Sequence, residues 1–105
     1  MLWALGFIDS LERPDKLCDV KKAVLLLRDN GRQGFLQKSK LRPQNELLDA
    51  ADLIYRYHWA TEDARLNGSE APSGLDPGAL MERHHALNWL VGYLGQDWDD
   101  ITTDT

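Results

Sequence analysis

The stretches DLIYRYHWATEDARL, from Asp52 to Leu66, and MERHHALNWLVGY, from Met81 to Tyr93, decide the fold of this chain. Both are typical of helices, and both place charged, histidine, asparagine and aromatic side chains among the apolar positions that should face a core. Because buried polar groups destabilise a fold unless they are paired, the two helices are expected to share a buried polar network. That network is either a functional site or the polar contact that joins the two helices.

The rest of the chain carries further helix signals. These signals are apolar side chains at three- and four-residue spacing, together with capping aspartates, prolines and glycines at the expected ends. The chain is therefore predicted to be all-α, with four to five helices in a small bundle-like array. The predicted helices run from Met1 to about Leu11, from the capping Asp19 to Asn30, from Gln33 to Ser39, from Pro43 to about Leu66, and from Pro77 to about Leu94.

One segment also allows a different interpretation. Residues 24–36 can be drawn as a small hairpin in an α+β fold, with Asp29-Asn30-Gly31 as its turn. The leucine-rich composition of this segment and the Lys21-Lys22 pair before it favour the helix.

Length and composition narrow the class of protein. The chain has 105 residues, a formal net charge of -5 and a single cysteine, Cys18. This length suits one helical unit over residues 1–105, with residues 96–105 as an acidic tail in which Trp98 and Ile101 act as anchors. The acidic balance disfavours nucleic acid, and no apolar run has the length that spans a bilayer, so neither partner is expected. Cys18, next to Asp19, is predicted to be a small packing residue in a reducing, cytoplasmic environment.

Several motifs occur in a characteristic order, namely WALG at residues 3–6, DLIYRYHWA at 52–60, ERHHALNWL at 82–90 and WDDITTDT at 98–105. In this order they resemble a bacterial family of unknown function, domain 4272. The resemblance implies no established activity. It does imply that members are longer than this chain, which would then be the C-terminal portion of the family domain. Without a preceding half, an exposed apolar patch is expected at Leu2, Trp3, Leu5 and Ile8.

The third predicted helix places Arg56 among carboxylates and aromatic rings. Asp52 lies four residues before Arg56 and Asp63 lies two turns beyond it, while Tyr55 and Trp59 should stack on the adjacent face. A guanidinium held in this way can grip a carboxylate or phosphate of a ligand, or it can tie the helix to a neighbour. Arg56 is predicted to be more than half buried and ion-paired with Asp52, Asp63 or Glu82.

His58 is a possible metal ligand. Glu62 lies one turn further along the same helix, and His84 or His85 could join from the last helix. Two ligands on one helix are too few to define a site, so no metal is assigned. No cofactor is assigned either.

The last predicted helix has its polar groups crowded into two turns. Glu82 and His85 lie three residues apart and form a possible acid/base pair, while His84 and Asn88 lie four apart. Trp89 adds an aromatic edge to the face that carries His85. The structural alternative is that Glu82 favours the helix start and that the aromatic side chains belong to the core.

Taken together, these features favour an uncharacterised small helical module that works by binding. Its expected partner is a protein, either the missing N-terminal half of the same fold or another chain. The alternative is a hydrolase-type enzyme whose catalytic residues are Glu82, His85 and Arg56, with or without a metal. A structure that shows whether these residues converge on a pocket distinguishes the two hypotheses.

Overall fold

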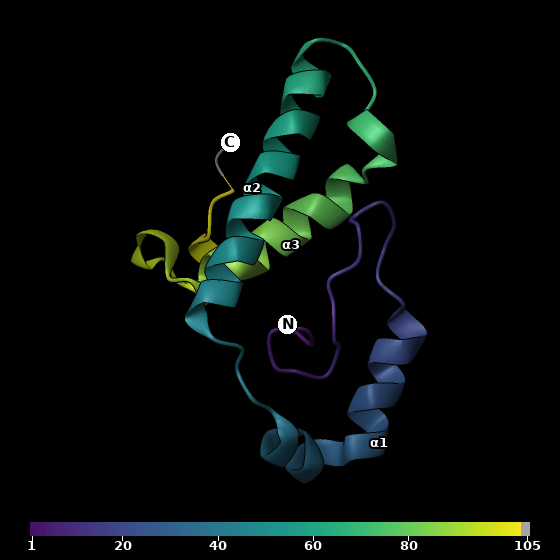
Figure 1. Cartoon of the computed structure of the whole chain (residues 1–105), viewed down its shortest axis with the longest axis vertical. Helices are drawn as coiled ribbons and strands as arrows, with labels where there is room; N and C mark the ends of the chain where they lie inside the picture. Colours follow the sequence, from purple (N-terminus) through teal and green to yellow (C-terminus); the bar gives the residue numbers. More distant parts are fainter. Residues whose placement is uncertain (104–105) are drawn as a thin grey trace.

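The computed structural model describes residues 1–103, apart from the side chain of Ser73. It contains three α-helices, and the described residues include no strand (Figure 1). The all-α prediction is therefore confirmed, whereas the hairpin near residues 24–36 and the number of four to five helices are wrong. The elements are α1 (Val20–Lys38), α2 (Gln44–Leu66), α3 (Pro77–Leu90) and the short 3₁₀ turns η1 (Pro72–Gly74), η2 (Tyr93–Gly95) and η3 (Trp98–Asp100).

The predicted helix at the start of the chain is absent. Residues 2–5 form turns, in which the Leu5 amide donates to the Met1 carbonyl over 3.0 Å. Gly6 then has φ of +88°, a left-handed backbone that ends the turn before a second turn can form. No helix follows this glycine, and the chain continues without regular structure to Asp19.

Helix α1 joins two segments that were predicted to be separate helices. Asp19 caps it as expected, since its Oδ1 accepts from the Lys22 amide over 3.0 Å. Gly31 has non-helical angles, φ 64° and ψ 177°, so two helical pieces meet at a kink at the Asn30-Gly31 stop that the sequence predicts. Across the bend, the Lys38 Nζ donates to the Asn30 side-chain oxygen over 3.0 Å.

Helices α2 and α3 begin where the sequence predicts. Pro43 precedes α2, and the Asp76 side chain accepts from the amides of Gly78 and Ala79 at the start of α3. Helix α2 ends at Leu66 as predicted. Helix α3 ends at Leu90 rather than Leu94, because Gly92 adopts φ of +73° and forms a left-handed stop.

The core lies between α2 and α3, which pack against each other as predicted (Figure 1). Leu87 and Tyr55 lie at this contact as expected, whereas Trp59 and Trp89, expected at or near it too, are 53% and 42% exposed. The fully buried apolar side chains of the core are Ile54 on α2, Leu80 and Leu87 on α3, and Leu75 just before α3. Partly buried side chains surround this cluster, among them Trp3 and Tyr57. The connection through η1 reverses the chain so that the two helices cover each other's apolar stripes.

The N-terminal segment runs between α1 and the α2–α3 pair (Figure 1). Its backbone is held by the link between α1 and α2, because the amides of Lys40 and Arg42 donate to the carbonyls of Leu5 and Ala4 over 3.0 and 2.8 Å. Phe7 stacks on Phe35 of α1, with ring centroids 4.7 Å apart.

The apolar patch expected at the start of the chain is not the main exposed surface. Leu2, Trp3, Leu5 and Ile8 are all half-buried. The residues of α1, by contrast, are all described, and none of them is buried. Cys18, predicted to be a packing residue, is exposed because the segment before α1 lies on the surface.

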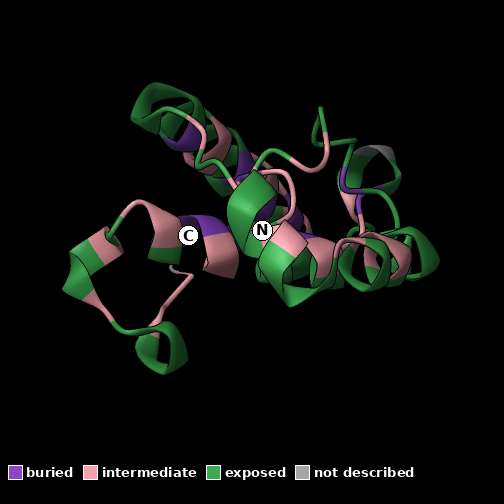
Figure 2. Ribbon diagram, turned by 90° about the horizontal axis from the view of Figure 1, so that it is seen from below, coloured by how far each residue is buried: buried purple, intermediate pink, exposed green. Residues whose placement is uncertain are grey.

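The molecule is elongated, with principal extents of 48 × 31 × 24 Å. Its Cα radius of gyration is 14.9 Å, whereas a domain of this length typically has about 13 Å. Figure 2 shows that exposed and intermediate residues cover most of the chain. Within the described residues, no helix has both the length and the apolar character required to cross a bilayer.

Candidate functional site

A pair of histidines is buried at the contact between α2 and α3. His58 and His84 lie with their Nδ1 atoms 2.8 Å apart and their rings nearly perpendicular, at 86°. Only 6% of His58 and 2% of His84 is exposed. Two neutral imidazoles form this contact when one Nδ1 donates its proton and the other accepts it. The structure therefore brings together two of the predicted site residues, one from each helix.

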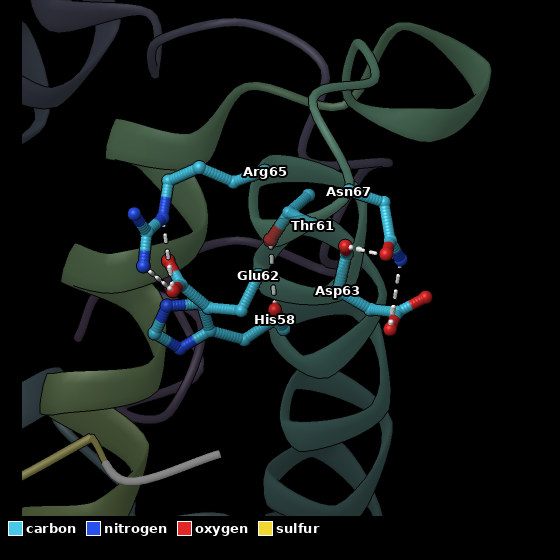
Figure 3. A network of polar contacts seen from close by, with 6 residues as sticks. All are labelled: His58, Thr61, Glu62, Asp63, Arg65 and Asn67. Carbon is cyan, nitrogen blue, oxygen red and sulfur yellow. Dashed lines mark hydrogen bonds and ion pairs between the residues drawn. The ribbon is translucent and has the colours of Figure 1, made fainter.

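Two further side chains flank this histidine pair. Tyr55, one turn before His58 on α2, meets the His84 ring edge-on at a centroid distance of 5.9 Å. Thr61 is buried beside the pair, and its hydroxyl donates to the His58 carbonyl over 2.8 Å (Figure 3). Its small, β-branched shape gave no signal in the sequence that distinguished it from an ordinary helix residue.

No metal site follows from this arrangement. Two ring nitrogens supply too few ligands for a structural metal. Within residues 1–103, no cluster of three or more His, Cys, Asp or Glu side chains is placed to hold an ion. Glu62, the predicted partner of His58, instead accepts from Arg65 Nη2 over 2.8 Å.

The predicted Arg56 group lies in solvent. Arg56 pairs with Asp52 over 3.1 Å as predicted, but 74% of the Arg56 side chain and 62% of the Asp52 side chain are exposed. The prediction that Arg56 is mostly buried is therefore wrong, because the face of α2 that carries it points away from α3. Asp63 contacts Asn67, the residue that caps the end of α2, rather than Arg56 (Figure 3). Trp59 is about half exposed on the same outer face.

Three predicted residues of α3 hold the C-terminal segment. His85 donates from Nε2 to the Trp98 carbonyl over 2.9 Å, and its ring lies 4.5 Å from that of Trp98. Asn88 is buried and donates to the Thr102 carbonyl over 3.0 Å. Trp89 meets Trp98 edge-on at 5.6 Å. Trp98 is thus the anchor that the sequence predicted, while Asp104 and Thr105 of the predicted tail lie outside the described residues.

The three catalytic candidates are not joined. Glu82 is exposed on α3, and within the described part of the chain no hydrogen bond or ion pair links it to His85 or to Arg56. The Nε2 proton of His85 is already donated to a backbone carbonyl. An acid/base step needs the donor and acceptor within hydrogen-bond reach, and this geometry does not provide it.

Sequence reasoning missed a cleft of about 570 Å³ between the N-terminal segment and α2. Arg42 forms one end of it, stacked 4.6 Å from the Trp3 ring centroid and donating to the carbonyls of Trp3, Ile8 and Asp9. Arg83 enters from α3 and donates to the Glu12 carbonyl over 2.8 Å. Burial removes part of the water around the Arg83 guanidinium, and this loss of hydration lowers the pKa of Arg83.

The charges around this cleft are mixed. Arg13, Arg42 and Arg83 suit a carboxylate or phosphate, but four carboxylates line the same cleft and would repel such a group. The four are Asp9, Glu12, Glu46 and Asp49. The arrangement accounts well for how the N-terminal segment is held and does not favour a particular ligand.

One ion pair at the end of α2, between Glu62 and Arg65, shifts the pKa values of both groups. Arg65 lies three residues after Glu62, and its hydrogen bonds lower the pKa of that carboxyl (Figure 3). The same contact raises the pKa of Arg65. Both groups face solvent, so this is a local surface pair rather than part of a buried site.

The described structure defines a small all-helical protein built on one packed helix pair with a buried histidine contact. Residues 1–101 match a family model described as a domain of unknown function, DUF4272, and the chain belongs to that family. No curated protein and no solved structure matches this chain.

Proposed function

We propose that this chain is a protein-interaction module that binds its partner through the outer face of α1. The observation that carries the proposal is that α1 buries none of its 19 residues. Its apolar side chains Val20, Val24, Leu27 and Leu36 are between 48% and 65% exposed. Val20, Val24 and Leu27 share one side of the helix, and contiguous exposed apolar surface of this kind is typical of interaction sites.

Helix energetics support the same conclusion. The kink at Gly31 divides α1 into two shorter pieces. Isolated helices below about 12–15 residues are only marginally stable in water, and most helical stability in proteins comes from packing an apolar face. Gly31 weakens α1 further because it interrupts the helical backbone. A partner on the outer face would supply the packing that the rest of the chain does not.

The charge of α1 indicates the kind of surface that it suits. The helix carries five of the twelve Lys and Arg residues but only one of the 17 Asp and Glu residues of the chain. A basic helix with an apolar stripe is expected to dock on an acidic surface that has an apolar centre.

A site-specific photo-crosslinker tests this proposal. A benzoyl-phenylalanine placed at Val24 in the full chain, expressed in cells, should give a discrete protein adduct on irradiation. The matched control is the same group at Asp29, which is also exposed on α1 but lies on the opposite side of the helix from Val20. Equal labelling from both positions, or none from Val24, would show that the outer face of α1 is not an interaction surface.

A further inference from the structure

We infer that the partner of α1 is α2 of a second copy of this chain. In the resulting dimer, α1 of each copy docks on α2 of the other. This inference rests on the proposed function, because it names the partner of the same α1 surface. Three observations support it: an apolar stripe on α1, a matching stripe on α2, and opposite charges beside the two.

The outer stripe of α1 consists of Val20, Val24 and Leu27, spaced by four and three residues and therefore aligned on one side of the helix. Each is about half exposed or more. Lys21 and Arg28, seven residues apart, lie together along one flank of this stripe. Both flanking side chains are exposed. Arg28 lies 3.7 Å from the carboxylate of Asp29, and Lys21 makes the net charge of this border positive.

Helix α2 carries a second stripe of exposed large side chains beside its buried face, where Tyr55 also meets the ring of the buried His84. Leu48, Tyr55, Trp59 and Leu66 are spaced by seven, four and seven residues, so they form one row along the helix. Their exposed fractions are 46%, 45%, 53% and 74%. Two large aromatic side chains in an exposed row are characteristic of the centre of a protein interface.

Carboxylates border the α2 stripe. Asp52 and Asp63 follow Leu48 and Trp59 by four residues each and lie along one flank, with Glu62 on the other. Within the described residues, Asp63 makes no ion pair and contacts only Asn67, so its charge is available to a partner. Asp52 is paired with Arg56 and Glu62 with Arg65, so Asp63 supplies the unpaired negative charge beside the α2 stripe, where the α1 stripe carries Lys21 and Arg28.

The distribution of charge over the whole chain agrees with this pairing. Without α1, the sequence retains seven basic and 16 acidic residues, while α1 itself has five basic and one acidic. When α1 of each copy docks on α2 of the other, these opposite charges meet in both of the α1–α2 contacts. This two-fold arrangement covers the α1 stripe and the α2 stripe of both copies, so no stripe is left to bind a third chain. An anionic lipid surface would cover α1 but would leave the aromatic row of α2 in water.

Sedimentation velocity on the full chain tests the inference, because the reciprocal geometry predicts an unusual rescue. The variant Lys21→Glu/Arg28→Glu reverses the border of the α1 stripe, and Asp52→Lys/Asp63→Lys reverses that of the α2 stripe. Each alone should weaken self-association by about tenfold or more, since like charges then meet in both contacts. Mixed together they should restore it, because one contact of the mixed dimer is unaltered and the other joins two reversed borders.

Control variants and alternative outcomes make the test decisive. Lys22→Glu reverses an exposed charge on the side of α1 opposite Val20 and should leave association unchanged, while far-ultraviolet circular dichroism checks that each variant is folded. A monomer at all concentrations, or a dimer whose variants show no rescue on mixing, overturns the inference. If the crosslinker at Val24 then captures a different protein, the proposed function stands without a second copy. A monomer that instead binds phosphatidylserine vesicles overturns both.

Discussion

His58 on α2 and His84 on α3 meet through their Nδ1 atoms at 2.8 Å, and both side chains are buried. This contact joins the two helices that form the core, and it requires one imidazole to donate and the other to accept. The polar residues that distinguish the two helices in the sequence therefore fall into a buried group and an exposed group. The histidines lie inside, while Asp52 and Arg56 lie in solvent.

Replacing His84 by Leu should destabilise the protein by about 1–3 kcal/mol, because the Nδ1 of the buried His58 loses its partner. Urea unfolding followed by circular dichroism measures the change. Met81→Leu, an exposed substitution on the same helix, is the control and should stay within about 0.5 kcal/mol. If both variants have the same stability as the parent protein, the histidine contact does not stabilise the helix pair.

Replacing Arg56 by Leu should change the free energy of unfolding by less than about 1 kcal/mol, since exposed ion pairs contribute little. The same urea titration, repeated at high salt, measures this and should show almost no salt-dependent difference from the parent. A loss of several kcal/mol would mean that Arg56 is buried in the folded protein, contrary to its exposure of 74%.

Replacing Arg42 by Met should release the N-terminal segment. The Arg42 side chain is only 20% exposed and donates to three carbonyls of that segment, so its loss should cost about 1.5–3 kcal/mol. Hydrogen exchange should accelerate at the amides of Leu5, Gly6 and Phe7, which are bonded within the released turn. Lys40→Met removes an exposed cation next to the same backbone and should leave these exchange rates unchanged.

Replacing Arg65 by Met should raise the pKa of Glu62 towards its ordinary value, because the hydrogen bond from Arg65 is the main cause of the lowered pKa. A carboxyl with a lowered pKa in the folded state adds stability above its unfolded pKa. That contribution disappears as the pH falls through the folded pKa. Carboxyl carbon chemical shifts, followed by NMR through the acidic range, measure the change. A titration of Glu62 that is identical in the two proteins would exclude the Arg65 contact in solution.

Local signals in the sequence determined the start of every helix. Asp19 and Asp76 offer side-chain oxygens to the free amides of a first helical turn, and Pro43 and Pro77 have backbone angles that suit it. These effects depend on residues close in the chain, so they can be recognised without the fold. The end of α2 at Asn67-Gly68 was predictable for the same reason. The stop at Gly92 was missed because the apolar residues around it continue the helical pattern.

The tertiary structure alone decided which face of each helix is buried. The periodicity of α2 is consistent with Arg56 facing either inward or outward, because polar and apolar residues are distributed around most of the helix. Packing against α3 selected the face with Ile54 and His58, and so left the row from Leu48 to Leu66 exposed. The pairing of His58 with His84 joins residues 26 positions apart, a contact that no local pattern specifies. The sequence determined the helices through short-range backbone chemistry, whereas long-range packing determined which side chains they bury and which they leave exposed.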